Sequence, residues 1–69
     1  MADNLENSND YVTEQEFAKA IRKALEKHKV EDLAEEFAAT TGVINRWAKE
    51  KSSPMRYARS VILQRLENL

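Results

Sequence analysis

The stretch Leu33–Pro54 constrains the fold of this chain more than any other. Its apolar side chains recur at helical spacing: Leu33, Ala34, Phe37, Val43, Ile44 and Trp47. A break at residues 38–41 divides them into two short apolar edges, each repeating at intervals of one to four residues. Two short amphipathic helices cannot bury their apolar faces alone. The stretch therefore predicts two helices joined by a tight corner and packed on flanking helices.

Composition restricts what can surround these helices. The chain has 69 residues with one Gly, one Pro and no Cys, so a turn-rich β fold, disulfides and Cys-ligated zinc are excluded. No apolar run is long enough for a membrane span, and the acidic N-terminus does not have the pattern of a secretory signal. We therefore expect one small all-α domain, in the cytoplasm.

The N-terminal part divides into a tail and a scaffold helix. Residues 1–10 are polar and acidic, which predicts a disordered tail before a domain at residues 11–69. Thr13 and Glu16 have the spacing of a capping box, which predicts a helix from there to about Lys27. Phe17 lies in the stripe that this helix is expected to bury.

Catalytic chemistry finds no support in the side chains present. His28 is the only histidine, and no cysteine or hydroxyl–base pair accompanies it. A histidine at a helix end, favoured by the macrodipole, explains it better than a metal site. We predict no enzyme activity, no cofactor, no metal and no small-molecule substrate.

Charge is unevenly distributed although the net charge is only −1. Residues 1–39 carry ten acidic and five basic side chains, a balance of −5, whereas residues 40–69 carry two acidic and six basic ones, a balance of +4. A local cationic face, rather than total charge, attracts a polyanion. Two solvated faces of different sign would give the same counts.

The outer face of the second short helix carries groups that suit base edges: Thr41, Gly42, Asn45 and Arg46. Arg46 can bind guanine O6 and N7 bidentately, and Asn45 can bind adenine. Gly42 lets the backbone approach closely. An apolar inner face with such an outer face is typical of a helix-turn-helix whose second helix enters the DNA major groove.

Further residues suit contacts to the DNA backbone: Thr40, Lys49, Lys51, Ser52, Arg56 and Arg59. Thr40 is also the expected cap of the second helix. Ser53 and Pro54 predict the cap and the start of the next helix. Phosphate contacts position a protein without reading sequence. Solvated lysines in a loop are the structural alternative.

The segment resembles the lambda-repressor and Cro type of helix-turn-helix over about a third of the chain. The residues that carry the resemblance are Leu33, Ala34, Phe37, Ala38, Ala39, Thr40, Ile44, Trp47 and Pro54. It implies a lambda-repressor-like bundle of four to five helices, with the motif at residues 30–50 and its core formed by Leu33, Ala34, Phe37, Ala39, Ile44 and Trp47. It also implies sequence-specific binding of double-stranded DNA in transcriptional control, by a phage-type or prophage-type repressor.

Three positions depart from the family pattern. Ala38 stands where the family usually has Gly at a corner that often needs positive φ. Glu50 stands where Gly commonly ends the second helix, which predicts that this helix continues into Lys51. Val30 replaces a Gln that often holds a phosphate, so one expected DNA contact is missing.

The last expected helix, from Met55 to about Asn68, has too many apolar residues for one buried stripe. The residues expected in the core are Met55, Ala58, Ile62 and Leu66. A second face would contain Tyr57, Val61, Leu63 and Leu69, which predicts a homodimer through this helix. The family resemblance also implies dimers, which bind two half-sites one helical turn apart.

A protein-interaction module remains the alternative function, as an adaptor or an antitoxin-like partner that uses this fold without DNA. Fold does not fix function, and the acidic first half of the chain favours this alternative. The two functions differ in whether Arg46, Lys49, Lys51 and Arg56 form one exposed surface. Neutralisation of that surface by Glu35 and Glu36 would favour the interaction module.

Overall fold

The computed structural model describes residues 12–69, which are all-helical, with four helices and no strands. The helices are α2 (Glu14–Leu25), α3 (Val30–Glu36), α4 (Thr41–Ala48) and α5 (Arg56–Glu67). The prediction of an all-α chain is confirmed for this part of the sequence. The predicted tail at residues 1–10 and Tyr11 lie outside the described residues.

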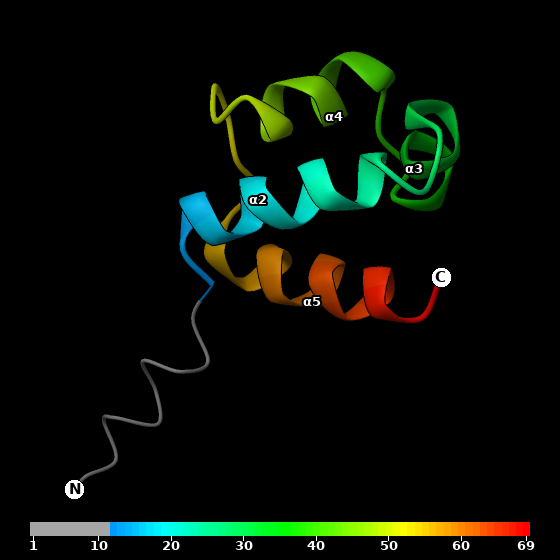
Figure 1. Ribbon diagram of the computed structural model, residues 1–69. Coiled ribbons are helices and arrows are strands. Elements are labelled where there is room, and N and C mark those ends of the chain that lie inside the picture. Colours follow the sequence, from blue (N-terminus) through cyan, green and yellow to red (C-terminus); the bar gives the residue numbers. More distant parts are fainter. Residues whose placement is uncertain (1–11) are drawn as a thin grey trace, which may run out of the picture.

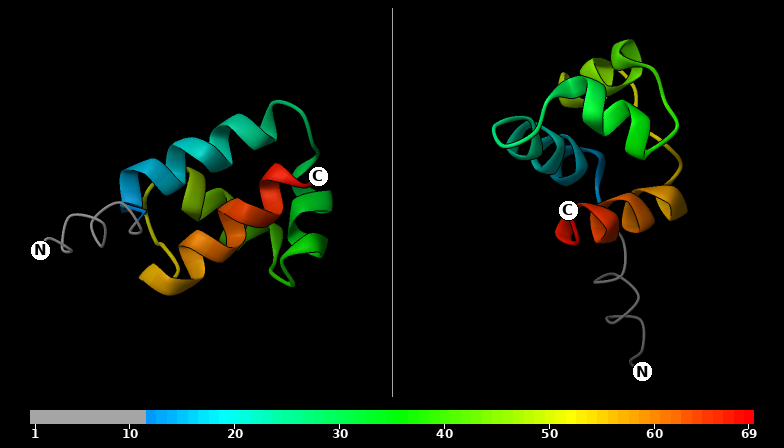
Figure 2. Two further views of the ribbon diagram at one scale, coloured as in Figure 1. Left: turned by 90° about the horizontal axis from the view of Figure 1, so that it is seen from below. Right: turned by 90° about the vertical axis from the view of Figure 1, so that its right-hand side faces the viewer.

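Helix α2 forms the centre of the arrangement. It lies between α4 and α5 and contacts both of them, while α3 packs against α4 at one end of the bundle (Figures 1 and 2). Helix α2 ends at Leu25, two residues earlier than predicted. The amides of Glu26 and Lys27 there donate to carbonyls three residues back, which tightens the last turn.

The core lies where α2, α3 and α4 meet. Phe17, Ile21, Leu33 and Ile44 are its largest fully buried side chains. The ring of Trp47, 9% exposed, meets Phe17 edge to face, with centroids 5.3 Å apart and planes at 72°. Each such side chain contributes about 1.5–3 kcal/mol by leaving water. The apolar residues of α3 and α4 therefore form the core together with Phe17 and Ile21 of α2.

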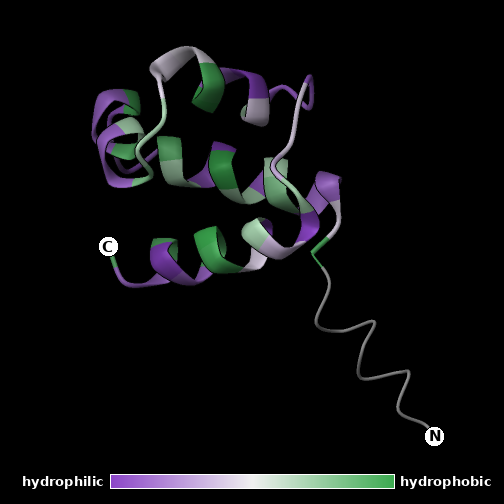
Figure 3. Cartoon of the chain, turned by 180° about the vertical axis from the view of Figure 1, so that it is seen from behind, coloured by the Kyte–Doolittle hydropathy of each residue, from purple (hydrophilic) through white to green (hydrophobic). Residues whose placement is uncertain are grey.

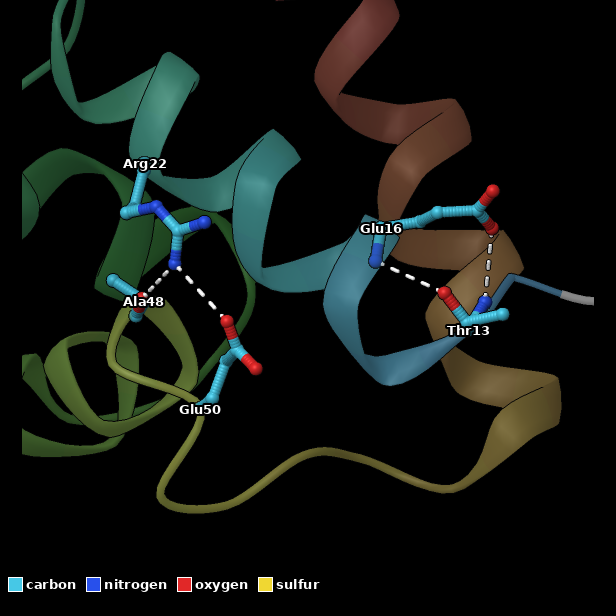
Figure 4. Close-up of polar contacts among 5 residues, drawn as sticks. All are labelled: Thr13, Glu16, Arg22, Ala48 and Glu50. Carbon is cyan, nitrogen blue, oxygen red and sulfur yellow. Dashed lines mark hydrogen bonds and ion pairs between the residues drawn. The ribbon is translucent and has the colours of Figure 1, made fainter.

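The start of α2 has the predicted capping box. The amide of Glu16 donates to Thr13 Oγ1, and the amide of Thr13 donates to Glu16 Oε1, both at 3.0 Å (Figure 4). These bonds satisfy two amide donors that a helix start leaves without partners. Val12, just before the cap, packs against the core cluster.

Both α3 and α4 end in a Schellman motif whose left-handed residue is not glycine. After α3, Ala38 has φ 54°, and the amide of Ala39 donates to the carbonyl of Ala34. After α4, Glu50 has φ 62°, and the amide of Lys51 donates to the carbonyl of Arg46. The expectation that α4 continues into Lys51 is therefore wrong, because Glu50 adopts the turn that usually takes Gly.

Replacing Ala38 with glycine should stabilise the protein by about 1 kcal/mol, because the Cβ atom is disfavoured at positive φ. The melting temperature should rise by about 4–8 °C for a domain of this size. Ala20→Gly, the same change inside α2, should instead destabilise by about 0.5–1 kcal/mol. Thermal unfolding followed by circular dichroism measures both, and equal signs for the two variants would contradict the role of Ala38.

The start of α5 differs from the prediction. The helix begins at Arg56, with Met55 as its N-cap residue. No side-chain hydrogen bond caps this helix start, and Pro54 comes directly before Met55. Ser53 does not cap α5, because the N-cap position falls on Met55, two residues later; the Ser53 hydroxyl accepts a hydrogen bond from Arg59.

The faces of α5 are also distributed differently from the prediction. Met55, expected in the core, is 71% exposed, because it stands before the first turn. Leu63, expected on the outer face, packs against the core cluster beside Ile62 and Leu66. No residue of α5 is fully buried, and the half-buried Ile62, Leu63 and Leu66 that pack on the core cluster lie in its C-terminal half. Figure 3 shows the hydrophilic segments on α3 and in the loop that follows α4.

Candidate nucleic-acid interface

Helix α4 presents a polar face to solvent because its opposite face is fixed in the core. Ile44, Trp47 and Ala48 are buried against α2 and α3. The exposed residues of the helix are Thr41, Gly42, Asn45 and Arg46. The structure therefore brings all four predicted base-reading residues onto one side of one helix, with Lys49 one turn beyond Asn45.

Thr40 caps the start of this helix. Its Oγ1 accepts a hydrogen bond of 3.1 Å from the amide of Val43, and the residue is exposed. A threonine hydroxyl can accept and donate at the same time. The hydroxyl hydrogen of Thr40 can therefore be donated to an oxygen of a bound phosphate while the cap stays intact.

Gly42 has no internal reason to lack a side chain. A Cβ atom built at this position would meet only Thr40 Oγ1 at 3.8 Å, an ordinary van der Waals contact. The residue is exposed in the first turn of α4, and its φ is not positive. Nothing in the described residues requires glycine there. The open space lies on the outer side of the helix.

The loop after α4 carries the predicted phosphate-binding residues. Lys49, Lys51 and Ser52 are exposed, and so is Arg56 at the start of α5. These residues follow one another along the connection that descends from α4 to α5 (Figure 1). The chain thus places two lysines and one hydroxyl directly after the C-terminal end of α4, and Arg56 at the far end of the connection, where α5 begins.

Arg59 is occupied by the protein itself. Its Nε donates to the carbonyl of Val12 at 2.8 Å, and its Nη1 donates to the carbonyl of Pro54 at 2.9 Å and to Ser53 Oγ at 3.2 Å. Only Nη2 is left for a further partner. Arg59 therefore ties α5 to the preceding loop and to the start of α2. Its predicted phosphate contact is not tested by this arrangement.

Two acidic side chains near these elements have cationic partners. Glu36 accepts from Arg65 of α5 at 3.1 Å, and Glu50 pairs with Arg22 of α2 at 3.6 Å. Glu35 is exposed on α3. The charge of Glu36 is therefore engaged between α3 and α5, and the acidic outer side of α3 retains Glu31, Asp32 and Glu35.

Arg22 is the residue of this region that sequence reasoning missed. Its side chain is half exposed, yet its Nη1 donates to the carbonyl of Ala48 at 2.6 Å. No local pattern signals this contact, because the two residues lie 26 positions apart. Only the packing of α2 against α4 brings them together.

Residues 12–69 contain no group of three or more His, Cys, Asp or Glu side chains that could hold a metal ion. None of their helices combines the length and apolarity needed to cross a membrane. His28 lies half-buried in the connection between α2 and α3.

Comparison with models of protein families found no match. Searches for similar sequences among curated proteins and for similar solved structures found none either.

Proposed function

We propose that this protein binds double-stranded DNA sequence-specifically and acts as a transcriptional regulator. Helices α3 and α4 would form the helix-turn-helix, with α4 in the major groove. The observation that carries the proposal is the outer face of α4, where small, hydrogen-bonding and cationic side chains stand opposite the face that Ile44, Trp47 and Ala48 bury in the core. Such a helix can present its outer face to base edges without disturbing the core.

Base reading is assigned to Arg46 and Asn45. Both are exposed in the second turn of α4, and Asn45 lies one turn beyond Thr41 on the same face of the helix. The guanidinium of Arg46 matches the two acceptors of guanine, and the amide of Asn45 matches the acceptor and donor of adenine. Thr41 can reach a base edge or a phosphate. The proposed readout therefore uses neighbouring side chains of a rigid helix.

Phosphate contacts are assigned to the two ends of α4. Thr40 offers its hydroxyl at the N-terminal end, and Lys49, Lys51 and Ser52 follow the C-terminal end. Arg56 continues this set at the start of α5. The balance of +4 over residues 40–69 supports attraction of a polyanion to this part of the chain. These contacts would fix the register of α4 in the groove.

Gly42→Ala separates folding from binding. Alanine should stabilise α4 by about 0.5 kcal/mol, because the added Cβ meets no internal clash and favours helix. The same Cβ should weaken DNA binding several-fold if the backbone of α4 approaches the groove closely. Chemical denaturation and DNA titration of the same preparation measure the two effects. Unchanged affinity in a stabilised variant would remove Gly42 from the interface.

The proposed active form is a homodimer through the outer side of α5. Tyr57 and Val61 are 79% and 44% exposed there, and Gln64 and Asn68 continue the stripe at spacings of three and four. This uncharged stripe has the 4-3-4 spacing of a helix–helix seam. A dimer would place two α4 helices on two half-sites of one operator.

Sedimentation tests the dimer. Tyr57→Glu puts a charge into the proposed seam and should convert the wild-type dimer into a species of the chain mass, 8.0 kDa. Gln15→Glu adds the same charge at an exposed position of α2, outside the proposed seam, and should leave the dimer intact. A wild-type protein that stays at the chain mass at high concentration, with or without DNA, would rule the dimer out.

Fluorescence anisotropy of a labelled mixed-sequence duplex tests the function itself. The logarithm of the binding constant should fall linearly with the logarithm of salt concentration, because phosphate contacts release counterions. Selection from a random duplex library should then yield a preferred site. An absence of binding even at low salt would reject DNA binding and favour the protein-interaction module.

A further inference from the structure

Arg22 connects α2 to the C-terminal end of α4. Its Nη1 donates to the carbonyl of Ala48 at 2.6 Å and lies 3.6 Å from Glu50 Oε2 (Figure 4). The side chains of Arg22 and Glu50 are 50% and 44% exposed. One nitrogen atom of α2 thus contacts both the last residue of α4 and the turn that follows it.

The contact completes the hydrogen bonding at the end of α4. A helix leaves its last four carbonyls without partners from within the helix. Here three of them, those of Asn45, Arg46 and Trp47, accept from the amides of Lys49, Lys51 and Glu50 in turn. The remaining carbonyl, that of Ala48, accepts from Arg22. The helix end is therefore closed by its own turn and by α2 together.

The turn itself has a conformation that its residue disfavours. Glu50 has φ 62°, in the left-handed region where a Cβ atom is strained. Glycine would adopt this conformation freely but could not reach Arg22. A glutamate at this position can, and its Oε2 lies 3.6 Å from Arg22 Nη1. Arg22 therefore contacts a turn whose conformation Glu50 disfavours.

We infer that Arg22 is a positioning residue for the proposed DNA interface. It fixes the turn at Glu50, and this turn sets the direction in which Lys51 and Ser52 leave α4. Arg22 itself lies on α2 and is assigned no contact with DNA. Its effect on DNA binding rests on the proposed function, whereas its effect on the turn does not.

A double-mutant cycle tests the effect on the turn. Amide exchange is measured by NMR for wild type, Arg22→Met, Glu50→Gly and the double variant. Arg22→Met should speed exchange of the Glu50 and Lys51 amides about tenfold relative to the Ile44 amide. The reason is that loss of the hydrogen bond from Arg22 to the Ala48 carbonyl lets the turn open locally. In the Glu50→Gly background, Arg22→Met should change the exchange rate of the Lys51 amide by less than about threefold, because glycine adopts the turn without support from Arg22.

Lys23→Met is the matched control, because it removes the same charge from the next residue of α2, which is also exposed. Glu50→Gln keeps both side-chain lengths and removes only the ion pair, so it should speed exchange of the Lys51 amide by a smaller factor than Arg22→Met. The inference is overturned if Arg22→Met changes the exchange rate of the Lys51 amide equally in wild type and in Glu50→Gly. It is also overturned if this change is no larger than the one that Lys23→Met causes.

DNA titration of the same variants tests the consequence for binding. Arg22→Met should weaken binding about fivefold at the selected site and at a mixed-sequence duplex alike, because phosphate contacts carry no sequence information. A loss no greater than that of Lys23→Met overturns the positioning role at the interface. If the wild-type protein binds no DNA, the proposed function fails, and the exchange cycle alone decides whether Arg22 positions the turn.

Discussion

Arg46→Ala is expected to lower the affinity for the selected DNA site by about 5- to 150-fold, while binding to unrelated duplexes changes far less. The expected loss corresponds to about 1–3 kcal/mol, the value of one bidentate contact to guanine. Arg46 is exposed on α4 and outside the core, so the substitution should leave the fold intact. Anisotropy titration at the selected and unrelated duplexes measures the ratio of the two affinities.

Lys49→Ala is the matched control for base reading. It removes the same charge one turn after Asn45, from a side chain assigned to phosphate. Its loss should be similar at all sequences and should reduce the slope of log affinity against log salt by about one. If Arg46→Ala also lowers the affinity equally for every duplex, Arg46 contacts phosphate, and the base-reading proposal loses its main residue.

Phe17→Ala is expected to leave much of the protein unfolded at 25 °C. Phe17 is 1% exposed and contacts the ring of Trp47, so its loss removes buried area and leaves a cavity, at a cost of about 3–5 kcal/mol. A folded domain of this size has a free energy of unfolding of only about 3–10 kcal/mol. Urea titration followed by circular dichroism and by Trp47 fluorescence measures the loss.

Met55→Ala is the control for this substitution. It removes a large apolar side chain that is 71% exposed and lies outside the proposed dimer seam, so the free energy of unfolding should change by less than about 0.5 kcal/mol. Trp47 is the only tryptophan, and its emission should shift to longer wavelength in Phe17→Ala alone. A cost below about 1 kcal/mol for Phe17→Ala would contradict the core described here.

The sequence by itself determined the features that depend on nearby residues. A single Gly, a single Pro and apolar residues at helical spacing predict an all-helical chain. The Thr13–Glu16 capping box needs only a spacing of three, and both of its hydrogen bonds are present. The exposure of Asn45 and Arg46 follows from the burial of Ile44 and Trp47 on the same helix, so the candidate face of α4 could also be predicted.

Only the tertiary structure decided how the helices end and which far residues hold them. The guanidinium groups of Arg22 and Arg59 donate to carbonyls 26 and 47 positions away, and no local sequence pattern signals either contact. Glu50 ends α4 against its own backbone preference, where it pairs with α2. Met55 is exposed and Leu63 packs inward because α5 docks with its C-terminal half on the core. Helical periodicity predicts a face, but packing among distant helices determines which part of that face is buried.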